Sequence, residues 1–104
     1  MRGFWALPIV LLQPVLAAHA DDQAALVRMV RQDCGSCHGM TLNGGLGTPL
    51  TAQALREKPV ENLVATILYG RAGTAMPAWK TMLSEADAQW IAGHLLQGFP
   101  EERR

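Results

Sequence analysis

Two cysteines three residues apart, Cys34 and Cys37, constrain this chain more than any other feature of its sequence. They are its only cysteines, and a bridge between them would close a loop too small to restrict the unfolded chain. The chain has 104 residues, enough for one small domain. A domain of this size builds only a small hydrophobic core. Something other than a disulfide framework must therefore stabilise it.

The first twenty residues have the features of a secretory signal peptide. Arg2 supplies an early positive charge, an apolar run extends from Phe4 to Leu16, and Ala18-His19-Ala20 is a pattern that signal peptidase accepts. The run is shorter than the roughly 20 residues of a membrane-spanning helix. We expect a cleaved signal peptide over residues 1–20, export to the periplasm, and one domain over residues 21–104 without stable membrane insertion. An uncleaved anchor and a buried core helix are the alternatives.

The overall composition excludes two classes of protein. Nine Lys and Arg residues balance nine Asp and Glu residues, so the formal net charge is zero. This balance argues against a strongly basic nucleic-acid-binding protein. Hydrophobic residues make up 49 % of the chain, too large a share for a disordered segment.

The pattern of apolar residues predicts helices separated by loops rich in Gly and Pro, with no convincing strand. The predicted fold class is therefore all-α. Cap residues indicate where the helices begin, and Gly70, Gly98 and Pro100 indicate where two of them end. The expected helices run from Asp21 or Asp22 into the segment that starts at Cys34, from Thr51 to about Lys58, from Pro59 to Tyr69, and from Ser84 to about Gln97.

The cysteine pair is followed directly by a histidine, in the motif Cys34-Gly35-Ser36-Cys37-His38. Thiols at this spacing reach both vinyl groups of one haem and form thioether bonds with them. His38 then lies beneath the porphyrin, where a ring nitrogen can bind the iron. We predict one covalently attached haem c per chain, with His38 as the proximal iron ligand. The haem also supplies the apolar core that so short a chain lacks.

A zinc site and a thiol oxidoreductase are the rival interpretations of the cysteine pair. A structural zinc needs four ligands, and no second pair of Cys or His residues completes them. A thiol oxidoreductase would want its pair at a helix start after a strand, and no strand precedes Cys34. The expected export favours haem, because c-type haem is attached outside the cytoplasm.

The other face of the iron needs a second ligand, and Met76 is the strongest candidate. It lies in an irregular loop far from His38 in sequence, between Gly73 and Pro77. Pro77 favours an extended backbone at Met76, and a stiff loop can hold a weak thioether ligand on iron.

Three other methionines and one histidine are candidates for the same position. Met40 is too close to the motif in sequence to reach the far face, and Met29 is more simply a core residue of the first helix. Met82, His94 and an open coordination site stay as alternatives. His94 lies on the apolar stripe of the last helix, where packing is the commoner role.

With these residues identified, the chain resembles a class I c-type cytochrome over residues 21–98. The motif near the end of the first helix, the Gly/Pro loop, the helix before Met76-Pro77 and the closing helix carry this resemblance. More narrowly, the chain is similar to the NirC group of small cytochromes associated with cytochrome cd1 nitrite reductase, and to the haem c domain of that reductase. The closer match is carried by Gln32–Leu42, Gly44–Gly47, Ile67–Arg71 and Met76-Pro77-Ala78-Trp79.

The resemblance implies a small cytochrome c fold, with three to four helices wrapped around the haem. It also implies a one-electron carrier rather than an enzyme. The expected role is periplasmic electron transfer in denitrification, by a monomer whose partners are redox proteins such as the nitrite reductase. A factor in the maturation of the reductase's haem d1 is the alternative, and a haem protein with an open sixth coordination site is a further one.

Contacts around the haem follow from the same resemblance. In class I cytochromes a backbone carbonyl after the Gly loop accepts a hydrogen bond from the proximal histidine, and here both Thr48 and Pro49 stand at that place. Trp79 and Arg71 are candidates for contacts to the haem propionates, through the indole N–H and through a charge-assisted hydrogen bond. A covering side chain and a solvated loop cation are the simpler interpretations of these two residues.

Overall fold

The computed structural model describes residues 3, 5–9 and 20–102. Residues 1–2, 4, 10–19 and 103–104 lie outside the described part of the chain. Most of the expected signal peptide over residues 1–20 falls there, so the signal peptide stays a prediction. Within the described residues, no helix has the length and apolar character needed to cross a membrane.

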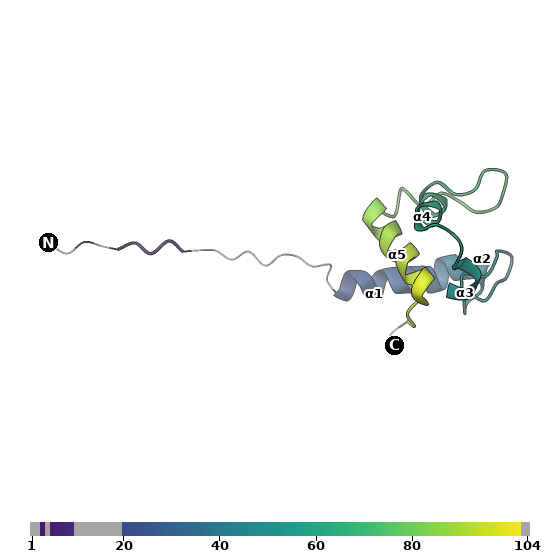
Figure 1. Cartoon of the computed structure of the whole chain (residues 1–104), viewed down its shortest axis with the longest axis horizontal. Coiled ribbons are helices and arrows are strands. Elements are labelled where there is room, and N and C mark those ends of the chain that lie inside the picture. Colours follow the sequence, from purple (N-terminus) through teal and green to yellow (C-terminus); the bar gives the residue numbers. More distant parts are fainter. Residues whose placement is uncertain (1–2, 4, 10–19, 103–104) are drawn as a thin grey trace.

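The described residues form helices joined by loops and contain no strand (Figure 1). The predicted all-α fold is therefore confirmed. The helical elements are α1 (Ala20–Met29), a π-helical turn η1 (Val30–Cys34), α2 (Gly35–His38), α3 (Ala52–Leu55), α4 (Val60–Tyr69) and α5 (Glu85–Gln97).

Local sequence signals fix where the later helices begin. Thr51 Oγ1 accepts a hydrogen bond from the Ala54 amide at 3.1 Å and caps α3. Ser84 and Asp87 form the predicted capping box at the start of α5, because each side chain accepts from the backbone amide of the other at 3.0 Å. Pro59 is the N-cap of α4 and not its first helical residue, one position from the expectation.

The first helix contains a π-helical turn that its sequence pattern did not predict. In η1 the Gly35 amide donates to the carbonyl of Val30, five residues earlier, and also to that of Gln32. A π-turn holds one residue more than an α-helical turn requires. Because each α-helical residue advances about 100°, the motif after η1 is rotated by about that angle relative to an uninterrupted helix.

The hydrophobic core lies where the first helix, α5 and the loops between them meet. Val30 of η1 packs in one cluster with Ile91 and Leu95 of α5. The buried members from the loops and α3 are Leu42, Leu55 and Leu83. In Figure 1 the loop that follows α2 and the loop that follows α4 both extend on the side of the domain away from the start of α1. The first of these loops contains Gly47 and Thr48, and the second contains Met76.

Candidate functional site

The side chain of His38 is fixed from one side by the loop that follows it. Its Nδ1 lies 2.7 Å from the carbonyl oxygen of Thr48. A carbonyl oxygen only accepts, so Nδ1 donates this hydrogen bond, and in the neutral imidazole Nε2 is then the nitrogen with a lone pair that can bind a metal. Of the two carbonyls that the sequence left open, the structure thus assigns Thr48 and not Pro49. A hydrogen bond of this kind holds the ring in one orientation and raises the basicity of the ligating nitrogen.

The loop reaches His38 because a glycine lies against the imidazole. A β-carbon on Gly47 would come within 2.7 Å of Nδ1 and 2.8 Å of Cε1 of His38, closer than real atoms approach. The Gly47 amide donates to the Cys37 carbonyl at 2.7 Å, and the Gly44 amide donates to the His38 carbonyl at 2.8 Å. The backbone of the loop therefore closes on the motif itself, and it lies against the side of the imidazole that carries Nδ1.

The two cysteines have different surroundings. Cys34 is half-buried beside the hydrophobic core, and Cys37 is exposed; both are free thiols. Burial raises the pKa of the Cys34 thiol to about 11, and the negative charge of Asp33 adds to the effect. Reactive thiols of oxidoreductases have a lowered pKa. The raised pKa therefore argues against the thiol oxidoreductase interpretation.

The donor set of this site suits a c-type haem. It contains two free thiols, one of them beside an apolar cluster, and an imidazole whose unprotonated Nε2 is free while its other nitrogen is hydrogen-bonded. Thiols form the covalent attachment and the imidazole supplies an axial ligand in such proteins. Among the described residues, no group of three or more His, Cys, Asp or Glu side chains is arranged to hold a metal ion.

Met76 lies half-buried in the loop between α4 and α5, and that loop is closed by hydrogen bonds. The Arg71 amide donates to the Met76 carbonyl at 3.3 Å, and the Met76 amide donates to Thr74 Oγ1 at 3.3 Å. Gly70 has a φ of 70°, and a β-carbon there would come within 2.6 Å of the Met76 carbonyl oxygen. The loop thus returns onto the end of α4, which fixes the backbone at Met76.

The other methionines have different settings. Met40 and Met82 have exposed fractions of 64 % and 67 %, whereas Met29 packs against the hydrophobic core from α1. None of the three combines partial burial with a closed loop.

His94 is held by its own helix. Its Nδ1 donates to the Trp90 carbonyl at 2.8 Å, and its ring stacks on that of Trp90 with 3.8 Å between the centroids. These contacts suit the packing role that the helix position indicated.

Trp79 and Arg71 flank Met76 in the same loop region. Trp79 is half-buried against the hydrophobic core, and its backbone amide donates to the Ile67 carbonyl at 3.0 Å. The side chain of Arg71 is exposed. The packing of Trp79 agrees with its interpretation as a covering residue.

The fold and the motif define the class of protein: a small all-α domain with a haem-attachment motif, as in c-type cytochromes. A family model described as "Cytochrome C oxidase, cbb3-type, subunit III" matches residues 21–95. The cytochrome c55X of Stutzerimonas stutzeri is 46 % identical over 101 residues, which cover 97 % of this chain and 87 % of the relative. The solved structure of a c-type cytochrome NirC has a TM-score of 0.74 and 53 % identity, over 76 % of this chain and 93 % of that one.

The chain therefore belongs to this family of c-type cytochromes, and within it to the NirC type. The resemblance indicated by the sequence is confirmed. Members of the family are electron-transfer proteins rather than enzymes, and so is this chain. Part of a larger protein is also similar: dihydro-haem d1 dehydrogenase NirN, solved in complex with DHE, matches with a TM-score of 0.64 and 31 % identity over 74 % of this chain and 17 % of that one.

Sequence reasoning missed two features near the site. One is the π-turn η1, which ends at Cys34, the first residue of the motif, and the other is the buried Arg31 within it. An arginine in a helix usually lies at the surface, so its residue type gave no signal.

Proposed function

We propose that this chain carries one covalently attached haem c, with Cys34 and Cys37 as its thioether attachments and His38 as the proximal iron ligand. The observation that carries the proposal is the hydrogen-bonded imidazole: the Thr48 carbonyl oxygen lies 2.7 Å from Nδ1, and the Gly47 backbone lies so close that a β-carbon there would overlap the ring. Nε2 is thereby presented in one direction, directly after the cysteine pair.

Met76 is the distal ligand that we propose. Its support is partial burial on a loop whose backbone is closed by hydrogen bonds, a setting that Met29, Met40 and Met82 lack. Arg71 and Trp79 lie at the two ends of that loop, and we propose them as the propionate contacts.

The haem supplies one-electron exchange between its ferrous and ferric forms. The protein residues bound to the iron determine whether a substrate can reach it and at which potential it is reduced. With His38 and Met76 both bound to the iron, no coordination position would be left for a substrate. A thioether ligand in place of a second imidazole favours the reduced form and raises the reduction potential.

We also propose that the mature chain is a monomeric periplasmic protein that begins at Asp21. The family match begins at residue 21, and α1 spans Ala20–Met29, so cleavage after Ala20 removes only the first residue of α1 and none of the matched residues. Export would bring the chain to the compartment where c-type haem is attached.

Electron transfer in the nitrite reductase system is the role that we propose, with cytochrome cd1 nitrite reductase as the partner. The similarity to NirC supports it. The second candidate is a part in the maturation of haem d1. It is favoured by the likeness to dihydro-haem d1 dehydrogenase, because a dehydrogenase reaction releases electrons that an acceptor must take up.

Optical spectra of the periplasmic protein test the proposed ligands. The oxidised wild type should show a low-spin haem c spectrum with the weak far-red band of a methionine–iron bond. Met76→Ala should abolish that band, whereas the matched control Met82→Ala, at an exposed methionine, should retain it. A high-spin wild type, or a band that survives in Met76→Ala, would refute the ligand assignment.

Deletion of the gene separates the two roles. If the chain is only an electron carrier to the reductase, the reductase isolated from the deletion strain contains its full complement of haem d1. If the chain serves maturation, that reductase is deficient in haem d1.

A further inference from the structure

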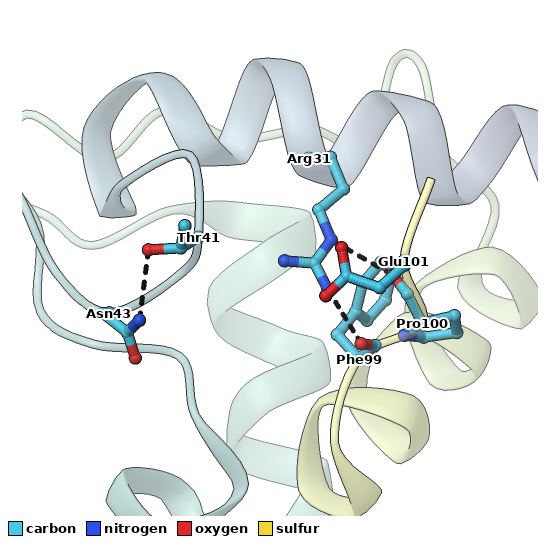
Figure 2. A network of polar contacts seen from close by, with 6 residues as sticks. All are labelled: Arg31, Thr41, Asn43, Phe99, Pro100 and Glu101. Carbon is cyan, nitrogen blue, oxygen red and sulfur yellow. Dashed lines mark hydrogen bonds and ion pairs between the residues drawn. The ribbon is translucent and has the colours of Figure 1, made fainter. Parts of the chain in front are cut away.

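Three contacts tie Arg31 of η1 to the last described residues of the chain (Figure 2). Its Nε donates to the carbonyl oxygen of Pro100 at 3.1 Å, and its Nη2 donates to that of Phe99 at 2.8 Å. The same Nη2 lies 3.5 Å from the carboxylate of Glu101. We call these three contacts the C-terminal clasp.

The C-terminal clasp supplies hydrogen-bond acceptors to the buried guanidinium of Arg31. Only 9 % of the surface of Arg31 is exposed, and a guanidinium stays charged at any pH at which proteins fold. Its burial is unfavourable unless hydrogen bonds replace those to water. The Glu101 side chain is 92 % exposed, so its ion pair adds little. The two carbonyls of Phe99 and Pro100 therefore define the geometry of the clasp.

Two further contacts to the C-terminal segment lie beside the C-terminal clasp, on the same side of α1 and η1. Gln32 Nε2 donates to a carboxylate oxygen of Glu102 at 3.0 Å, and Arg28 Nε lies 3.9 Å from the same oxygen. Residues three and four positions apart share one helix face, so Arg28, Arg31 and Gln32 together face the C-terminal segment.

The C-terminal segment is not closely packed against the helices beside it. A cavity of about 250 Å³ lies between the C-terminal segment and the helices α1 and α5. Its lining includes Val27, Trp90, His94 and Pro100. Beyond Phe99, which packs on the core, the segment is held mainly by its hydrogen bonds to η1.

The C-terminal clasp binds η1, the turn that determines the direction of the haem-attachment motif. η1 contains Arg31 and ends at Cys34, and α2, with Cys37 and His38, follows without a break. If η1 relaxed to an α-helical turn, everything after it would rotate by about 100° relative to the face that packs on α5. A contact that fixes η1 thus fixes the directions of the cysteines and of His38.

We propose that Arg31 is a positioning residue for haem ligation: by binding the backbone of Phe99 and Pro100 it holds η1 in its π-helical form and so presents Cys34 and His38 in the direction that attachment requires. This inference rests on the proposed function, because it concerns the same haem. It means that correct ligation depends on Phe99 and Pro100, whose carbonyls bind a segment almost seventy residues earlier.

A purely structural role for Arg31 makes a different prediction. In that case, loss of the clasp lowers the unfolding temperature and leaves the haem of the remaining folded protein unchanged. A positioning role changes the haem environment of molecules that are still folded. Spectroscopic readings per haem, taken well below the unfolding temperature, distinguish the two roles.

The experiment compares full-length Arg31→Lys, Arg31→Met and Ile91→Val with the wild type, all produced in the periplasm with the haem-attachment machinery. Lysine keeps the charge but cannot donate two fork-like hydrogen bonds, and methionine removes both. Ile91→Val shortens a buried residue of α5 and is the control for lost stability alone. Glu101→Gln removes the exposed ion pair, keeps both carbonyl bonds, and should resemble the wild type.

Three quantities are measured per haem: the far-red methionine–iron band, the number of thioether bonds from the pyridine haemochrome spectrum, and the reduction potential. We expect Arg31→Met to lose about half or more of the far-red band and to contain haem with a single thioether, as loss of a contact behind a ligand typically affects metal binding. Arg31→Lys should show a smaller change in the same direction.

Readings in both Arg31 variants that equal those of Ile91→Val would overturn the proposal. If Arg31→Met yields no haem protein, Arg31→Lys and Gln32→Ala decide, and unchanged spectra in both refute it. The proposed function fails separately, if the wild type itself contains no haem or no methionine–iron band.

Discussion

The imidazole of His38 and the backbone of Gly47 lie so close that a β-carbon on Gly47 would come within 2.7 Å of Nδ1. The close approach brings the next residue, Thr48, to its hydrogen bond with the same nitrogen. Steric contact and hydrogen bond therefore act together, and the residue type at position 47 decides whether the imidazole can keep its orientation.

Substitution of Gly47 should disturb the site more than its small size suggests. In Gly47→Ala the new methyl group must displace the His38 ring or the loop, at a cost of about 1–3 kcal/mol, as in other overpacked sites. We expect a lower unfolding temperature and a weaker methionine–iron band, measured by thermal melts and optical spectra. Gly93→Ala is the control: a β-carbon there meets nothing within 4 Å, and alanine in α5 should stabilise the helix by about 0.5–1 kcal/mol. Equal stability of the two variants would contradict the steric argument.

Short-range signals in the sequence were sufficient for most of the fold. The cap at Thr51 and the capping box at Ser84 each depend on residues within about four positions of one another, because they reflect local backbone hydrogen bonds. The motif from Cys34 to His38 is equally local, because it is defined by the spacing of two thiols and an imidazole that suits one haem. Features of this kind can be recognised before the chain is folded in space.

Long-range geometry accounts for what the sequence left open. Thr48 and Pro49 could not be separated, because the choice depends on the path of a loop around the His38 ring. The buried state of Arg31 depends on carbonyls 68 and 69 positions away. The choice between Thr48 and Pro49 and the burial of Arg31 do not follow from the residue types at those positions. No local sequence pattern therefore predicts either feature.

The two thiols should differ in reactivity in the chain produced without haem attachment. Cys37 is exposed, whereas burial raises the pKa of Cys34 to about 11 from 9.0. Near neutral pH, iodoacetamide should modify Cys37 first, as peptide mass spectrometry would show. Above pH 9 the unfolded chain releases the Cys34 proton while the folded chain keeps it, so the stability of the haem-free fold should fall as the pH rises from 9 to 11. Equal modification of both thiols would mean that this part of the fold does not form without haem.

The capping box of α5 should contribute measurably to stability. Ser84→Ala removes the acceptor for the Asp87 amide, and the loss of such a cap costs about 1 kcal/mol. Because α5 supplies Ile91 and Leu95 to the core, the cost should appear in the unfolding of the whole domain, measured by denaturant titration. Ser36→Ala serves as the control, since Ser36 is exposed and its hydroxyl caps no helix: it donates to the Asp33 carbonyl at 2.7 Å and to Cys37 Sγ at 3.9 Å. Its stability should remain nearer to that of the wild type.

Electron exchange with a redox partner should depend little on ionic strength. The segment 34–55, which contains the attachment motif and the loop around His38, has no Asp, Glu, Lys or Arg, and neither does the segment 72–79 around Met76. Leu46 is 96 % exposed in the first of these loops. Attraction between oppositely charged surfaces raises the association rate of two proteins by a factor of about 10–1000, and added salt removes this increase. An uncharged face lacks this contribution.

We therefore expect the rate of electron transfer to cytochrome cd1 nitrite reductase, measured by stopped flow, to change less than about threefold between roughly 20 and 500 mM salt. Leu46→Lys places a charge on this face and should make the rate depend on salt. Val60→Lys is the matched control, because Val60 is 37 % exposed at the start of α4 and lies outside both uncharged segments. A wild-type rate that falls tenfold or more with salt would show that charges elsewhere on the chain direct the encounter. An equal response of the two lysine variants would place the contact away from Leu46.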